Sequence, residues 1–204
     1  MSLRPEHALI VDRVPEGARV LDVGCADGTL LRALSERKSI RGSGLELDGR
    51  DVAAAIASGL SVIQGDADRD LADYPDDAFD AVILSDSIQA MRDPKTALAH
   101  VLRIGKIGIV SFPNFGHWRV RLALGLGGRM PKTAELPARW HETQNIHLCT
   151  TLDFADLCEE VGADIAYAAA FGRRTWEFRP RGVAARWACA AASSALFEVR
   201  PRRR

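Results

Sequence analysis

The chain has 204 residues, of which 47% are hydrophobic and 26% charged, a composition that is typical of a folded protein and excludes an intrinsically disordered one. Its 27 basic and 27 acidic side chains give a formal net charge of zero, so charge gives no reason to expect nucleic acid or an anionic membrane as the main partner. The sequence has no signal-peptide core, no uncharged run near the roughly 18 to 20 residues that span a membrane and no C-x-x-C pair, so we expect a cytoplasmic protein with free thiols and no metal.

Strands and helices alternate along the first half of the chain. Each expected strand is a short aliphatic or β-branched run, and each expected helix carries apolar residues at helical spacing. In chain order they are a strand at 19–23, a helix at 30–38 with Thr29 as its cap, a strand at 41–47, a helix at 51–58, strands at 60–64 and 80–85, a helix at 94–103 and a strand at 106–112. This order predicts a parallel sheet whose ligands bind beyond the carboxyl ends of its strands.

The periodicity is lost between residues 114 and 148, where Gly, Pro, Trp, His and Arg are frequent. A segment of this length without a strong element is too long for an ordinary connection, so we expect a functional lid or a partner surface. After it the sequence predicts a helix at 152–161, a strand at 164–171, a helix at 183–193 and a last strand at 195–199. The chain should thus form one α/β domain over 1–204, with a seven-stranded, mostly parallel sheet, an antiparallel last strand and helices on both faces.

A glycine-rich turn follows the first expected strand. The run Asp22-Val23-Gly24-Cys25-Ala26-Asp27-Gly28 is typical of the first motif of Rossmann-like class I methyltransferases, with Ala26 in place of its middle glycine. Gly24 and Gly28 allow a sharp turn and a close approach of the backbone to a ligand, and Asp22 would hold the ammonium group of S-adenosylmethionine. A nicotinamide dinucleotide fits less well, because G-x-G-x-x-G is absent and Asp27 would place a negative charge where a pyrophosphate binds.

Polar residues of the expected types end the next three strands. Glu46 is placed to accept hydrogen bonds from the ribose hydroxyls, Asp66 from the adenine amino group, and Ser85 with Asp86 would lie over the methionine half of the ligand. We therefore predict a site for S-adenosylmethionine or S-adenosylhomocysteine formed by Asp22, Gly24, Cys25, Ala26, Gly28, Glu46, Leu47, Asp66, Ala67 and Ser85.

The 114–148 segment contains the residue types that are favoured at protein interfaces. The expected partner-binding residues are His117, Trp118, Arg119, Arg121, Arg129 and Trp140. A lid over the ligand and a structural insertion are the alternatives. Candidate bases for methyl transfer are His117, His141, His147 and Asp86, but none of them belongs to a diagnostic pair, so the sequence assigns no catalytic residue.

Several further segments are specific enough to indicate a family. They are Gly59 to Gln64, Val82 to Ser85 with Gln89-Ala90, Val110 to Arg121 (VSFPNFGHWRVR), Gly128 to Pro131, and Asn145 to Thr150 with Asp153-Phe154. With these segments the chain resembles the MetW family of methionine biosynthesis proteins over nearly its whole length; it departs from the family pattern at Ala26 and over 140–145. The resemblance implies a methyltransferase-like fold and a role beside a homoserine O-acyltransferase of the MetX type, as its partner or activator.

Two other functions stay open at this stage. One is an active methyltransferase of a small molecule. The other is a nucleic-acid methyltransferase that uses the arginine-rich stretch over 173–204, although we expect no nucleic-acid partner.

Overall fold

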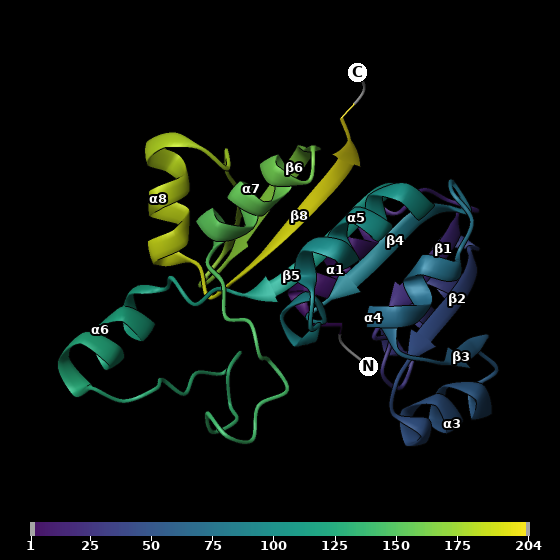
Figure 1. Cartoon of the computed structure of the whole chain (residues 1–204), viewed down its shortest axis with the longest axis horizontal. Helices are drawn as coiled ribbons and strands as arrows, with labels where there is room; N and C mark the ends of the chain where they lie inside the picture. Colours follow the sequence, from purple (N-terminus) through teal and green to yellow (C-terminus); the bar gives the residue numbers. More distant parts are fainter. Residues whose placement is uncertain (1–2, 203–204) are drawn as a thin grey trace.

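A computed structural model describes residues 3–202 and shows one mixed sheet with helices on both faces (Figure 1). The strands are β1 (Arg19–Val23), β2 (Arg41–Glu46), β3 (Val62–Gln64), β4 (Phe79–Ser85), β5 (Gly105–Pro113), β6 (Ala163–Phe171), β7 (Thr175–Glu177) and β8 (Ser194–Pro201). The helices are α1 (Pro5–Arg13), α2 (Thr29–Lys38), α3 (Gly49–Ala57), α4 (Ala67–Asp70), α5 (Pro94–Ile104), α6 (Trp118–Gly127), α7 (Thr151–Glu160) and α8 (Gly182–Ala191).

The sheet has the strand order β3-β2-β1-β4-β5-β8-β6-β7. Strands β3, β2, β1, β4 and β5 pair in parallel, whereas β8 pairs antiparallel with both β5 and β6, and β7 antiparallel with β6. The α/β Rossmann-like architecture is as predicted, but the strand number is eight instead of seven because β7 was missed. From β1 the chain adds β2 and β3 on one side of the sheet, and then β4 and β5 on the other side. Ligands of such sheets bind at this switch point between β1 and β4.

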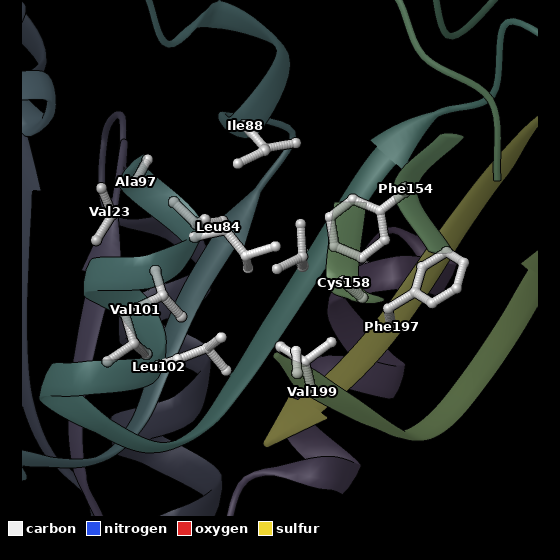
Figure 2. Close-up of a cluster of buried hydrophobic side chains, with 14 of the residues drawn as sticks. Val23, Leu84, Ile88, Ala97, Val101, Leu102, Phe154, Cys158, Phe197 and Val199 are labelled. Atoms are coloured by element: carbon white, nitrogen blue, oxygen red, sulfur yellow. The ribbon is translucent and has the colours of Figure 1, made fainter. Parts of the chain in front are cut away.

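Successive residues of the central strands enter different cores. Val82 and Leu84 pack against α5 and α7, whereas Ala81 and Ile83 pack against α1 and α2 on the other face. Figure 2 shows the first of these cores, in which Phe154 of α7 lies beside Phe197 of β8. Burial on both faces explains why β4 is a continuous apolar run and not an alternating one.

Helices α1, α4 and α6 were not predicted from the sequence, and all three lie in regions that matter for the site. Helix α1 was not predicted, although Pro5 at its first turn and Glu6 behind it are favourable helix-start residues. The segment 114–148 was predicted to lack a strong element, but α6 occupies ten of its residues. The N-cap of α2 is Gly28 in a left-handed conformation, so the predicted cap Thr29 is instead the first helical residue.

Figure 1 shows β3 and α3 at one end of the sheet and α6 and α8 at the other. In residues 3–202 no helix combines the length and the apolar character needed to cross a bilayer.

Candidate functional site

The turn between β1 and α2 has a backbone that favours glycine at three positions. Gly24, Ala26 and Gly28 have φ angles of +73°, +47° and +77°. A Cβ on Gly24 would lie 2.9 Å from the Cβ of Ser87, and one on Gly28 would overlap the side chain of Leu60. Ala26 adopts the same left-handed region at a steric cost that a glycine would avoid.

Asp22 lies just before this turn, at the end of β1, and is 1% exposed. Its Oδ1 atom is buried and has no hydrogen-bond partner in the described structure. Burial, and secondly the charge of Glu46, raise the pKa of the Asp22 carboxyl to about 7. A buried acceptor without a partner is costly, so a cationic donor at this place would be stabilised. This observation fits the ammonium group of S-adenosylmethionine.

Glu46, at the end of β2, closes the turn from the other side. Its Oε2 accepts from the backbone N–H of Ala26 at 2.8 Å, and its Oε1 accepts from the N–H groups of Leu47 and Asp48 at 2.7 and 2.9 Å. A carboxylate has about four acceptor positions, so one stays available for a ribose hydroxyl. Glu46 therefore has a structural role in addition to the ligand contact that we predict for it.

Apolar side chains lie open beside the third strand end. Leu47 is 66% exposed and Ile63 is 57% exposed. Asp66 caps α4, its Oδ1 accepting from Asp68 N–H at 3.1 Å, and Ala67 behind it is partly buried. Leu47 follows β2 and Asp66 follows β3, which pairs with β2. An apolar side chain and an acceptor at neighbouring strand ends offer what a purine needs.

The end of β4 is covered by the missed helix α1. Asp86 has a φ of +58° and forms an ion pair with Arg4 at 2.8 Å. Burial raises the pKa of Asp86 although Arg4 opposes the shift. His7 contacts the same guanidinium at 2.6 Å, and burial, then Arg4, lower the pKa of His7 to about 4. His7 is therefore neutral at pH 7, and with Arg4 it is a candidate site residue that sequence reasoning missed along with its helix.

The predicted partner-binding residues do not lie together in the structure. His117 caps α6, and Trp118 lies beside it with the guanidinium of Arg119 5.3 Å from its ring. Arg121 instead binds inward, because its Nε donates to Gly116 O at 2.6 Å and its Nη2 contacts Cys189 Sγ at 3.4 Å. Arg129 and Trp140 are exposed in the loop after α6 and do not line the cavities described below.

Two cavities open between this segment and the sheet. The larger, about 990 Å³, lies between α6 with residues 131–135 and the β7–α8 region; the smaller, about 400 Å³, reaches Arg4 and Asp86. Residues 134–135, 172–174 and Ser193 line both cavities. The edge of the candidate cofactor site is thereby continuous with a space beneath the 114–148 segment.

The candidate bases are not gathered at one point. Asp86 lies at the cofactor edge, whereas His117 lines the larger cavity. His147 contacts the carbonyl of Arg92 at 3.1 Å, and His141 is exposed beside Glu142. Within residues 3–202 there is also no group of three or more His, Cys, Asp or Glu side chains able to hold a metal ion.

Sequence comparison relates nearly the whole chain to one family. The family model described as methionine biosynthesis protein MetW matches residues 4–199. A bifunctional methionine biosynthesis protein MetXA/MetW of Rhodopirellula baltica is 33% identical over 174 residues, 81% of this chain and 28% of that protein. A demethylmenaquinone methyltransferase of Renibacterium salmoninarum is 31% identical over 126 residues, 54% of this chain and 50% of that protein. The chain therefore spans half or less of the length of these curated relatives.

Solved structures share the fold. A methyltransferase dependent on S-adenosylmethionine from Thermotoga maritima has a TM-score of 0.69 at 17% identity, with 97% of this chain and 87% of that one covered. Another from Methanosarcina mazei has a TM-score of 0.68 at 12% identity, with 100% of each chain covered. The fold is thus that of class I methyltransferases.

Proposed function

Because the chain belongs to the MetW family of methionine biosynthesis proteins, we propose that it binds S-adenosylmethionine or S-adenosylhomocysteine and acts in the cytoplasm as a partner of a MetX-type homoserine O-acyltransferase. Its four cysteines are free thiols, which agrees with that location.

One observation supports the acyltransferase as the partner. The Rhodopirellula relative bears both names, MetXA and MetW, in a single chain. Joining two proteins in one polypeptide keeps them at high effective concentration, which is useful when they work together. We therefore expect this chain to contact an acyltransferase of the MetX type through a binding surface.

The ligand is supported by the residues at the ends of β1 to β4. Asp22 would hold the ammonium group, Glu46 a ribose hydroxyl, and Asp66 with Leu47 the adenine. S-adenosylmethionine carries a transferable methyl group on its sulfonium sulfur, but no base in the structure is assigned to methyl transfer. We therefore propose a sensing role, in which occupancy of the site changes the activity of the acyltransferase. The shared walls of the two cavities would connect ligand and partner.

The test is a homoserine acylation assay with the purified acyltransferase of the same organism. The rate is measured with and without this protein, and each time with and without added S-adenosylmethionine. We expect this protein to change the rate, and the ligand to alter the size of that change. Equal rates in all four reactions, together with no association of the two proteins, would contradict the proposal.

A second function is favoured by the cavity of about 400 Å³ that reaches Asp86, because it lies where a methyl acceptor would have to meet the ligand. In this alternative the chain is an active methyltransferase of a small molecule. Transfer of labelled methyl groups from S-adenosylmethionine to a small molecule of cell extract, abolished by Asp22→Asn, would support it.

Nucleic acid remains outside the proposal. Several arginines of the 173–204 stretch are engaged in ion pairs, Arg181 with Glu159, Arg200 with Glu198 and Arg202 with Asp164. Arg203 and Arg204, which were expected to extend this stretch, lie outside the described residues. Salt-sensitive binding to DNA or RNA would contradict this view.

A further inference from the structure

Exposed apolar side chains are concentrated at one end of the molecule. Thirteen large hydrophobic side chains of the described residues are exposed, and six of them lie on helices α6 and α8. Leu126 of α6 is 84% exposed, and Val183 and Trp187 of α8 are 73% and 71% exposed. Figure 1 shows α6 and α8 together at this end of the sheet, away from β3 and α3. Apolar side chains gathered in this way mark an interaction surface.

The same end carries basic side chains that have no ion-pair partner among the described residues. Arg119, Lys132, Arg173 and Arg174 line the larger cavity, and none of them forms an ion pair with another of residues 3–202. Glu135 is the acid among the lining residues. Trp118, Trp176 and Trp187 line the same cavity. Arginine and tryptophan are the side chains most enriched at binding hot spots.

The exposure of the indoles distinguishes between two kinds of occupant. A pocket for a small molecule buries its aromatic side chains, but Trp118 is 48% and Trp187 is 71% exposed. The apolar surface also continues along α6 at Leu122 and Leu126, neither of which lines the larger cavity. A surface of this extent fits a protein better than a small molecule.

We propose that α6, residues 131–135, Arg173, Arg174 and the outer face of α8 form the docking face for the acyltransferase, which contributes an acidic surface with apolar side chains that enter the larger cavity. This inference rests on the proposed function. The sequence predicted partner binding by the 114–148 segment only. The proposed docking face includes both sides of the larger cavity, so α8 and the β6–β7 turn also contact the acyltransferase. The complementary charge would accelerate association, and the indoles would slow dissociation.

Two variants test the face. Arg173→Glu with Arg174→Glu reverses the charge at one wall, and Trp187→Ala removes an exposed indole; all three side chains are exposed, so both variants should fold. The matched control is Arg37→Glu with Arg41→Glu, which makes the same change of charge on exposed arginines of α2 and β2. Binding of each protein to the purified acyltransferase is measured at low and at physiological salt, and the affinity for S-adenosylmethionine is measured in parallel.

We expect both test variants to weaken binding of the acyltransferase at least about tenfold, while the control stays within about twofold of the wild type. The charge reversal should also weaken the salt dependence, whereas Trp187→Ala should keep it. Affinity for S-adenosylmethionine should be unchanged in Trp187→Ala and in the control, whose substituted residues lie outside the smaller cavity.

Wild-type affinity in both test variants, with clear binding by the wild type, would overturn the docking face and leave the proposed function standing. Equal weakening by the control would also overturn it, since the effect would then come from net charge. Absence of binding by the wild type would overturn both proposals.

Discussion

Asp22 determines how the candidate cofactor site should respond to pH. Its pKa is raised from 3.8 to about 7 by burial and by Glu46, so the folded protein favours the protonated carboxyl. The unfolded chain lacks this preference, and the stabilisation is therefore fully present below about pH 4 and is lost as the pH rises towards 7. A shift of this size corresponds to at most about 4 kcal/mol.

Asp22→Asn should remove this dependence, because the amide is neutral at every pH. We expect the free energy of unfolding of the wild type to fall by about 2–4 kcal/mol, relative to the variant, between pH 4 and 7. Urea unfolding of both proteins over this range is the measurement. The variant should also bind S-adenosylmethionine at least about tenfold more weakly at pH 8, because a charge-assisted contact is lost. If the free energies of unfolding of the two proteins changed in parallel with pH, Asp22 would not be the group that causes the pH dependence.

For single residues, the sequence predicted which acids lie at strand ends, but it did not predict their hydrogen bonds and ion pairs. The acids fall at the ends of β1, β2 and β4 because parallel strands end at one edge, and that edge follows from the alternation of elements. The hydrogen bonds of Glu46 to three backbone amides depend on how the turn folds back on β2, which no local pattern encodes. The ion pair of Arg4 with Asp86 joins residues 82 positions apart, so it could not be predicted from a local pattern either.

Asn114 shows how single elements are held together beside the larger cavity. It is 1% exposed, and its Nδ2 donates to the carbonyls of Cys189 and Ala192 at 2.7 Å each. Its Oδ1 accepts from the N–H groups of Gly116 and Thr151 at 3.0 and 3.4 Å. One side chain thus joins the end of β5 to the starts of α6 and α7 and to the end of α8.

Asn114→Ala should destabilise the protein by about 3 kcal/mol, because it leaves several buried backbone groups without a partner. Urea unfolding measures the loss, and Gln144→Ala, at an exposed loop position, serves as the control with an expected effect below about 0.5 kcal/mol. A loss below about 1 kcal/mol at Asn114 would mean that water replaces the amide and that the junction has other supports.

Helix α5 was predicted from its sequence, whereas α1 was missed although it also packs on the sheet. Helix α5 has Pro94 at its start and buried apolar residues at helical spacing, and its predicted range of 94–103 is close to the observed one. Helix α6 buries Val120 and leaves leucines exposed, so its sequence has no clear amphipathic period. The short edge strand β7 has three residues and depends on pairing with β6, so it gave no signal. The form of β7 therefore depends on a distant contact, and that of α6 goes with a surface left open.

The whole molecule joins its first helix to its last strand through one buried carboxylate. Glu198 in β8 is 1% exposed and accepts from Nε and Nη2 of Arg13 and from Nε and Nη2 of Arg200. The guanidinium of Arg13 also lies 4.3 Å from the centre of the Tyr167 ring. Helix α1 is thus fixed to β8 at its end, and to the cofactor edge through Arg4 and Asp86 at its beginning.

Arg13→Met should therefore lower the free energy of unfolding by more than the loss of a surface ion pair would. The remaining carboxylate would stay buried with Arg200 alone, whose side chain is 57% exposed, so we expect a loss of about 2 kcal/mol and a fall in Tm of about 4–8 °C. Arg200→Met is the matched control and should cost less than about 1 kcal/mol, because solvent screens that pair. Thermal unfolding at pH 7 compares the two. Equal losses would mean that the two arginines share the carboxylate evenly and that α1 is held to the sheet by the packing of Ile10 and Val11 instead.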